Sequence, residues 1–259
     1  MKSKNLSWWK TKKYPNWGDV LNPVLFEYIS GEKPTFIGIG NSSDTHRYFC
    51  IGSILPSYSP NAEIWGSGFM NEPWPDKKFV KPKKIHAVRG PQTRQIYIDR
   101  GIACPEVYGD PALLLPRYYF PKIEKKYKLG IIPHYVDQDN KWVKWKSELP
   151  YVKVIDILSG VHNVVDEMLS CEMIISSSLH GVIAADAYGI PNKWVEFSDK
   201  VGGGGFKFRD YFKSVGRRDR ESIKIDGHKM LKNIYPKMYD VNLKIDLDKL
   251  YKSCPFRKE

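Results

Sequence analysis

The sequence predicts an α/β protein, because short apolar strand patterns alternate along it with helical patterns. In the first half, strands are predicted at 35–39, 63–66 and 84–88. Helices are predicted between and after them, over 20–29, where apolar residues recur at helical spacing, and over 91–100, which begins with a proline. This order of elements is typical of parallel sheets covered by helices.

The second half of the chain repeats this alternation after a polar stretch over 117–126. That stretch is typical of a linker, and a chain of 259 residues is long enough for two domains with separate cores. We therefore place an N-terminal domain at 1–120 and a C-terminal domain, with a C-terminal tail, at 121–259. The later strands are predicted at 127–132, 151–156, 173–176 and 193–196, and the later helices at 161–169 and 182–188.

Composition favours a folded protein of a reducing compartment. Hydrophobic residues make up 42% and aromatic residues 14% of the chain, which disfavours disorder. The four cysteines lie far apart without a C-x-x-C pair, which argues against structural zinc and against a disulfide scaffold. No signal peptide and no apolar run of about 20 residues is visible. We expect the protein in the cytoplasm, with peripheral contact at the inner face of the membrane left open.

The net charge of +12 fits an anionic partner without identifying it, and many basic proteins are merely soluble. Nucleic acid, anionic lipid headgroups and small phosphorylated substrates all attract a basic protein. The densest basic segment, 207–224, is interrupted by Asp210, Asp219 and Glu221. Such mixed charge favours a solvated face over a stripe that binds nucleic acid, so we expect no nucleic-acid partner.

The segment at 176–185, Ser-Ser-Ser-Leu-His-Gly-Val-Ile-Ala-Ala, carries the clearest chemical signal. It places His180 between a predicted strand and a predicted helix, at the carboxyl end of the strand. Ligands of open α/β sheets bind at this edge, and a helix N-terminus there favours an anion. His180 is therefore a candidate acid or base, with a hydrogen-bonded structural histidine as the alternative.

Two glycine-rich segments carry weaker signals. The segment at 38–43 follows a strand but lacks the third glycine of a dinucleotide-binding loop, so it does not predict NAD. The four glycines at 202–205 fit a mobile lid over a ligand or a tolerated surface insertion.

Six segments in the same order along the chain resemble the polysaccharide pyruvyl transferase family. The most specific is the S-x-x-L-H-G-x-I-A core around His180. The chain departs from the family at Arg89-Gly90, where the family often has Arg-Asp. The six are Asn-Trp-Gly-Asp at 16–19, Trp-Gly-Ser-Gly at 65–68, Val-Arg-Gly-Pro at 88–91 with Thr93, Gly-Asp-Pro-Ala at 109–112, Pro-His-Tyr at 133–135, and the segment 177–184.

The resemblance implies two Rossmann-like domains that face each other across a cleft, as in GT-B glycosyltransferases. It also implies phosphoenolpyruvate as the donor and a sugar as the acceptor, within a polysaccharide, capsule or other cell-surface glycan precursor. The product would be a cyclic pyruvate ketal, and no cofactor is implied. A GT-B glycosyltransferase that uses a nucleotide sugar is the nearest alternative, and a non-catalytic basic module that binds nucleic acid or membrane is another.

Phosphoenolpyruvate carries a phosphate and a carboxylate, so its site needs clustered cations or N–H donors. By resemblance, Arg89 supplies one cation, and Lys200 stands at the position of the second. Lys207 competes with Lys200, and the sequence does not decide between them. We hypothesise that His180 acts as the acid or base while these cations neutralise the donor.

Four further residues are candidates for binding substrate. Ser177 and Ser178 fit either hydrogen bonds to phosphate or caps of the following helix, and capping is the favoured interpretation. Asp19 fits an acceptor hydroxyl or a cap of the helix near Val20, with the cap again slightly favoured. His134 follows a predicted strand and points toward the same edge. No metal-ligand spacing is evident.

The acceptor in this hypothesis is a sugar or a lipid-linked glycan. The Trp8-Trp9-Lys10 segment together with the basic charge makes contact with a membrane that carries such acceptors plausible, and packing of the same residues on the core is the alternative.

Overall fold

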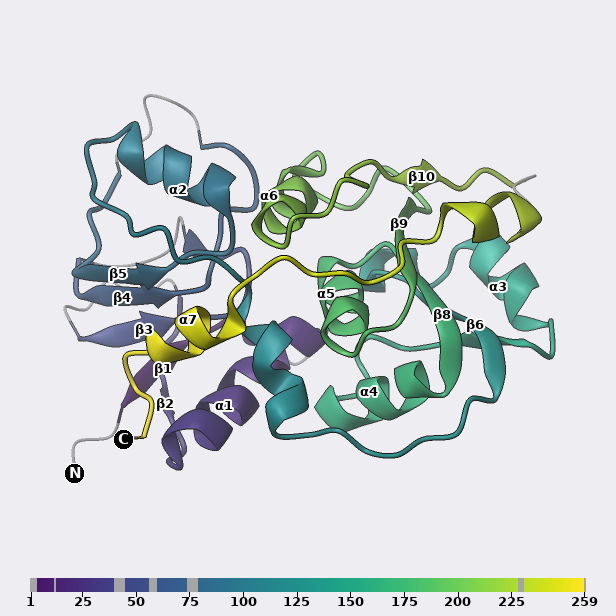
Figure 1. Cartoon of the computed structure of the whole chain (residues 1–259), viewed down its shortest axis with the longest axis horizontal. Coiled ribbons are helices and arrows are strands. Elements are labelled where there is room, and N and C mark those ends of the chain that lie inside the picture. Colours follow the sequence, from purple (N-terminus) through teal and green to yellow (C-terminus); the bar gives the residue numbers. More distant parts are fainter. Residues whose placement is uncertain are drawn as a thin grey trace.

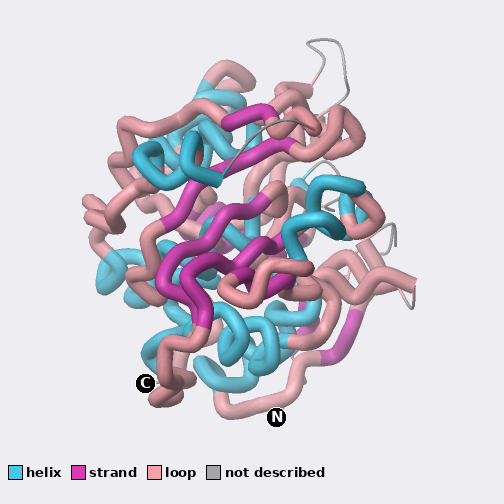
Figure 2. Tube along the Cα trace, turned by 90° about the vertical axis from the view of Figure 1, so that its right-hand side faces the viewer, coloured by secondary structure: helices cyan, strands magenta, loops and turns pink. Residues whose placement is uncertain are grey.

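The computed structural model describes residues 4–11, 13–39, 45–55, 60–73, 79–227 and 231–258. Its strands form two five-stranded sheets in which neighbouring strands run parallel, one in each half of the chain. In side view the strands lie in the middle of the molecule, with helices on either side (Figure 2). The predicted α/β class is therefore confirmed, with two parallel sheets.

The first sheet has the order β2-β1-β3-β4-β5. Helix α1 follows β1, helix α2 follows β5, and the 3-10 helix η2 closes this half (Figure 1). Two of its strands, β1 and β3, were not predicted, because β1 has polar residues on both sides of Leu6 and β3 contains a buried arginine. The bounds are β1 Asn5–Ser7, α1 Trp17–Ser30, β2 Thr35–Phe36, β3 Arg47–Phe49, β4 Ala62–Trp65, β5 Lys84–Ala87, α2 Pro91–Ile98 and η2 Pro111–Arg117.

The second sheet has the order β10-β9-β8-β6-β7. Its strands alternate with four helices, α3 to α6. The bounds are β6 Tyr127–Ile132, α3 Lys141–Ser147, β7 Val152–Val154, α4 Val161–Leu169, β8 Cys171–Ser176, α5 Leu179–Ala187, β9 Asn192–Glu196, α6 Phe206–Ser214 and β10 Ile223–Lys224; two short 3-10 helices, η4 Leu231–Asn233 and η5 Tyr235–Lys237, follow.

Counted within its own half, each sheet has the strand order 2-1-3-4-5 of doubly wound folds. The order reverses between the first and the third strand, which are β1 and β3 in one sheet and β6 and β8 in the other. A crevice opens at such a point because the connections leave toward opposite faces of the sheet. The topology therefore marks two places for a ligand, one in each half.

Helix α5 begins at Leu179, three residues before the predicted start at residue 182. His180 therefore lies within the first turn of the helix rather than before it. Helix α1 likewise begins at Trp17 rather than near Val20, because Trp17 is fully buried and its indole N–H donates to the carbonyl of Val161 at 3.0 Å. The start of α1 thus coincides with a contact between the two halves of the chain.

The chain end returns to the first half. Helix α7 (Leu247–Lys252) lies beside η2, and the indole of Trp65 donates to the carbonyl of Leu250 at 3.0 Å. Beyond it, Phe256 stacks on Phe26 with 4.2 Å between ring centroids. In Figure 1 both termini lie at the same side of the molecule. The first sheet lies before residue 120 and the second after residue 121, and the exact domain boundary stays a prediction.

The basic segment 207–224 is a solvated face only in part: Lys213, Arg218 and Lys224 are exposed, but two of its cations are buried. Lys207 is 7% exposed and Arg217 is fully buried. Arg217 is held by the carboxylate of Asp186, itself buried, and by the amide oxygen of Asn192. Two of the acids that interrupt the segment also pair with buried cations: Asp210 with Arg89, and Asp219 with Lys193. Among the described residues, no helix is long and apolar enough to cross a membrane.

Candidate active site

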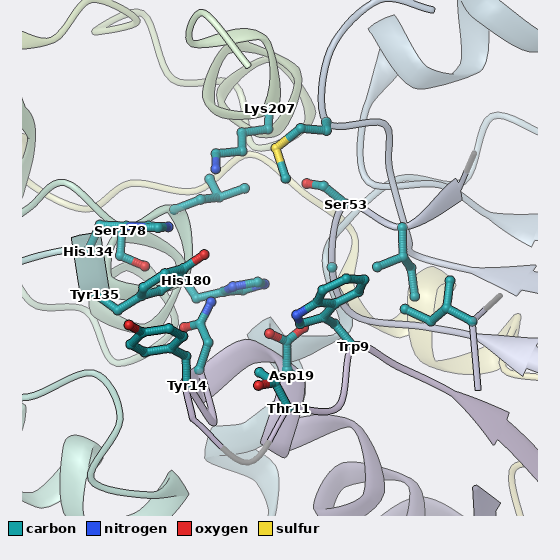
Figure 3. A pocket seen from close by; sticks show the side chains of 16 residues that line it. Trp9, Thr11, Tyr14, Asp19, Ser53, His134, Tyr135, Ser178, His180 and Lys207 are labelled. Atoms are coloured by element: carbon teal, nitrogen blue, oxygen red, sulfur yellow. The ribbon is translucent and has the colours of Figure 1, made fainter. Parts of the chain in front are cut away.

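A cavity of about 500 Å³ lies between the two halves. This volume is in the range of ligand sites in proteins. Most of its lining comes from the segments that follow β1 and β3 in the first half and β6 and β8 in the second, so the two reversal points of the strand order face one cavity (Figure 3). Ile39, Met70 and Lys207 come from the segments after β2, β4 and β9. Lining residues include Trp9, Thr11, Tyr14, Asp19 and Ser53 from the first half and His134, Tyr135, Ser178, His180 and Lys207 from the second.

His180 lies deep in this cavity. It is 8% exposed, and its ring packs so closely on Gly18 of α1 that a Cβ at residue 18 would lie 2.2 Å from Nδ1 and Cε1. Glycine is therefore required at this point of the Asn-Trp-Gly-Asp segment. Burial, and then the nearby cations Lys207 and Arg89, lower the pKa of His180 to about 3. In the unliganded protein the imidazole is neutral at pH 7.

Behind His180 stands a buried carboxyl group. Oδ2 of Asp110 lies 3.9 Å from Nε2 of His180, and neither atom has a hydrogen-bond partner among the described residues. Asp110 is fully buried just before η2, and its other oxygen accepts from the backbone N–H of Ala112 at 3.0 Å. Burial raises the pKa of Asp110 to about 7.

Lys207 and Asp19 enter the cavity from opposite halves. Lys207 reaches in from α6, and Asp19 from the first turn of α1 (Figure 3). Burial raises the pKa of Asp19 to about 7, against the pull of Lys207, while burial and then Arg89 lower the pKa of Lys207 to about 8. A partly buried cation and a carboxyl group that titrates near neutral pH therefore share one cavity.

Arg89 does not line the cavity but lies behind its wall, fully buried. It donates to the carboxylate of Asp210 at 3.1 Å, to the hydroxyl of Ser53 at 2.7 Å and to the carbonyl of Phe69 at 2.6 Å. Its link to the cavity is Ser53, which does line it. The sequence analysis expected a direct contact between Arg89 and the donor; in this arrangement Arg89 supports Ser53 and adds its charge from behind.

The sequence did not decide whether Lys200 or Lys207 would face the donor, and the two lysines take different positions in the structure. Lys207 lines the cavity, whereas Lys200 is exposed and is not among the lining residues. Lys200 follows β9 in a turn in which its backbone N–H donates to the hydroxyl of Ser198. On geometry, Lys207 is the candidate for an anionic ligand and Lys200 is not.

The two serines before α5 take different positions. Ser178 is the N-cap residue and lines the cavity, but its hydroxyl makes no cap hydrogen bond. Ser177 is buried outside the cavity lining, where its hydroxyl accepts from the backbone N–H of His134 at 2.9 Å and donates to Asp137 at 2.8 Å. The expected capping bond is therefore made by neither, and Ser177 instead fixes the His134 loop.

His134 and Asp19 both line the cavity. Burial, and then Lys207, lower the pKa of His134 to about 4, so this ring is neutral as well. Asp19 lies inside α1 rather than at its N-cap, where Asn16 stands, so the favoured capping interpretation was wrong for Asp19.

The sequence analysis missed much of the outer wall. Trp9 is 58% exposed at the cavity, and Tyr14 stacks on Tyr135 with 4.9 Å between ring centroids. The sequence suggested membrane contact or packing on the core for Trp9, and not a place at this cavity. Ser53 was missed because nothing in its sequence neighbourhood signals that a buried arginine would donate to it.

Among the residues that the structure describes, no group of His, Cys, Asp and Glu side chains could hold a metal ion. The chemical groups that the cavity does present are imidazole, carboxyl, ammonium, hydroxyl and aromatic rings.

The model of the family described as polysaccharide pyruvyl transferase matches residues 4–196 of this chain. The chain belongs to the polysaccharide pyruvyl transferase family. The match includes nearly every residue of the cavity; Lys207 lies beyond it.

Two curated proteins are similar to this family member. One is an uncharacterized protein, L143, of Acanthamoeba polyphaga mimivirus, 32% identical over 212 residues that make up 78% of this chain and 71% of the viral protein. The other is the succinoglycan biosynthesis protein ExoV of Rhizobium meliloti (strain 1021), 27% identical over 81% of this chain and 64% of ExoV. The chain thus matches under two thirds of the length of ExoV.

Proposed function

We propose that this protein transfers the pyruvyl unit of phosphoenolpyruvate onto a sugar of a polysaccharide or cell-surface glycan precursor and forms a pyruvate ketal. Membership of the polysaccharide pyruvyl transferase family supports transfer to a polysaccharide. The observation that carries the donor assignment is the cavity itself, which holds His180, Lys207 and the hydroxyl groups of Ser53 and Ser178 in one space.

The donor fits the inner end of the cavity. There Lys207 would face the phosphate or carboxylate, with the hydroxyls of Ser53 and Ser178 as hydrogen-bond donors. The N-terminus of α5, which begins next to Ser178, favours the same negative charge. Arg89, buried behind Ser53, adds positive charge without direct contact.

The reaction needs a proton at the methylene carbon of phosphoenolpyruvate while a sugar hydroxyl adds to the neighbouring carbon. A second hydroxyl then displaces phosphate and closes the ketal, and its proton leaves with the phosphate. In this proposal His180 delivers the first proton and the carboxylate form of Asp19 accepts the proton of the attacking hydroxyl, which is supported by the presence of both residues in the cavity. The chemistry uses the enol phosphate of the donor as its activated group and needs no cofactor.

The acceptor fits the outer, aromatic end. Pyranose rings present apolar C–H faces, and Trp9, Tyr14 and Tyr135 offer aromatic faces beside the polar groups of the cavity. We include in the proposal that the two halves are Rossmann-like units of the GT-B kind, that the protein works in the cytoplasm, and that lipid-linked glycans at the inner face of the membrane are among its acceptors.

Phosphate release on incubation with phosphoenolpyruvate and glycan acceptors tests this function. We expect acceptor-dependent phosphate from the wild-type protein and a loss of at least about 100-fold in kcat for His180→Ala, because a placed general acid contributes this much. His162→Ala is a matched control, since His162 lies outside the cavity and pairs with Tyr28. Nucleotide release from a sugar nucleotide, with no reaction of phosphoenolpyruvate, would instead identify a glycosyltransferase.

A further inference from the structure

The two facing atoms Oδ2 of Asp110 and Nε2 of His180 are buried polar atoms without a hydrogen-bond partner among the described residues. An unpaired polar atom in a protein interior costs about 1–3 kcal/mol, so two of them rarely face each other without a shared proton. Their separation of 3.9 Å closes to a hydrogen bond with a shift of about 1 Å. Hydrogen bonds in unliganded active sites are often long in this way.

The capping role of Asp110 does not account for this arrangement. The backbone N–H of Ala112 uses only Oδ1, and an asparagine could accept the same bond. Nothing in the cap requires the second oxygen to point at an imidazole. The ring of His180 is also fixed from the other side by its contact with Gly18.

We propose that Asp110 is the positioning residue of His180: its carboxyl group holds Nε2, leaves Nδ1 for the cavity, and replaces the proton that Nδ1 gives up. This inference rests on the proposed function for its catalytic part. It explains how a histidine that is neutral in the free protein can serve as an acid.

The proton balance is simple. In the active form the neutral carboxyl group of Asp110 donates its O–H to Nε2, and His180 carries its proton on Nδ1. When the Nδ1 proton moves to the methylene carbon of the donor, the Asp110 proton moves to Nε2. His180 remains neutral with its proton on the other nitrogen, and Asp110 becomes a carboxylate. The proton released by the acceptor hydroxyl then restores the starting form through Asp19 and solvent.

Several charged or titratable groups surround this pair. Lys207 of α6, Arg89 and His134 face His180, with Asp19 of α1 across the cavity. Arg89 also acts on Asp110, and Asp110 in turn acts on Cys50 and Tyr211. Of the groups that face His180, Asp110 and Asp19 have a pKa of about 7, and only Asp110 faces Nε2.

Nitrogen-15 NMR of the imidazole in the full-length protein without substrate tests the pairing. Below about pH 7 the neutral carboxyl group donates to Nε2, and we expect the proton of His180 on Nδ1. Above it the carboxylate accepts, and we expect the proton on Nε2. The chemical shifts of the two nitrogens should therefore exchange near pH 7 without the ring becoming charged. Shifts that stay constant from pH 5 to pH 9 in the wild-type protein would overturn the inference.

The variant Asp110→Asn distinguishes two roles of Asp110: positioning the ring of His180 and supplying a proton to its Nε2. The amide N–H donates to Nε2 at every pH, so the proton should stay on Nδ1 throughout, while the cap to Ala112 is kept. Since an amide gives up no proton, we expect kcat to fall by about 100-fold with the KM for phosphoenolpyruvate changed less than about 3-fold. A kcat within 3-fold of wild type would show that Asp110 only holds the ring and would contradict proton supply.

Asp246→Asn is the control, because Asp246 is also a capping carboxylate, at α7 and outside the cavity lining. We expect it to leave both the nitrogen shifts of His180 and kcat unchanged. The NMR titration involves no substrate. If the protein proves inactive with phosphoenolpyruvate while the tautomer still follows Asp110, the pairing stands and the proposed function fails.

Discussion

Burial sets the pKa of several residues at the cavity. Burial raises the pKa of Asp19 and of Asp110 to about 7 against the opposing effect of nearby cations. Burial and nearby cations together lower the pKa of His180 and of His134, so both rings are neutral. Perturbed values of this kind gather at functional sites. Here they gather at a single cavity between the halves, where the family motifs also meet.

Trp9 offers a test of the acceptor site at this scale. We expect Trp9→Ala to raise the KM for the glycan acceptor by about 10-fold, because one aromatic platform contributes about 1–1.5 kcal/mol, and to leave the KM for phosphoenolpyruvate nearly unchanged. Steady-state kinetics with each substrate varied in turn measures this. Trp145→Ala is matched to it, since Trp145 is 51% exposed and lies outside the cavity lining. Equal effects of the two changes would argue against an acceptor platform at Trp9.

At the scale of elements, helix α6 ties the halves together. Its Asp210 accepts hydrogen bonds from the backbone N–H groups of Gln92 and Thr93 at the start of α2, and it pairs with buried Arg89. Gly90 leaves the room for this approach, since a Cβ there would lie 2.1 Å from the carbonyl oxygen of Asp210. The carboxylate at the N-terminus of α2 thus comes from the other half of the chain. The same helix carries Lys207 into the cavity.

Asp210→Ala should lower the free energy of unfolding by about 3–5 kcal/mol, because it leaves the charge of Arg89 buried and unpaired. Urea unfolding at neutral pH measures the change. The double variant Arg89→Met/Asp210→Leu replaces the pair with apolar side chains, and we expect it to be more stable than Asp210→Ala alone. A loss below about 1 kcal/mol in Asp210→Ala would show that α6 is held by its apolar contacts instead.

At the scale of the whole molecule, the two sheets share a strand order. The C-terminal segment packs against the first sheet. Phe256 is 2% exposed and contacts Phe26, Tyr48 and Trp65, which belong to α1, β3 and β4. The last residues of the chain are therefore part of the core of its first half. The shared topology leaves no repeat in the sequence, because parallel strands are specified by burial and not by particular residues.

Phe256→Ala should therefore lower the free energy of unfolding by about 3 kcal/mol, as is usual when a buried phenylalanine is truncated. Phe120→Ala is the matched control, because Phe120 is 63% exposed, and we expect a change below about 1 kcal/mol. Urea unfolding followed by tryptophan fluorescence measures both. Similar small decreases in the free energy of unfolding of the two variants would mean that the C-terminal segment contributes little to the stability of the first half.

The sequence by itself determined the α/β class and most of the strands and helices in both halves, because these follow from local hydrophobic periodicity. It also determined the family, because motifs of adjacent residues identify it. It also singled out His180. It did not predict β1, β3 and β10, because Asn5, Ser7, Arg47 and Lys224 interrupt the apolar pattern of these short strands.

Only the tertiary structure decided which candidates share a cavity. It brought Lys207 in, left Lys200 at the surface, placed Arg89 behind Ser53 and set Asp110 against His180. Several of these relations join residues from opposite halves of the chain, as Asp110 and His180 do, and Lys207 with Asp19. Distance, burial and pKa at such a site depend on how two separately patterned halves pack, and no local pattern in the sequence records that packing.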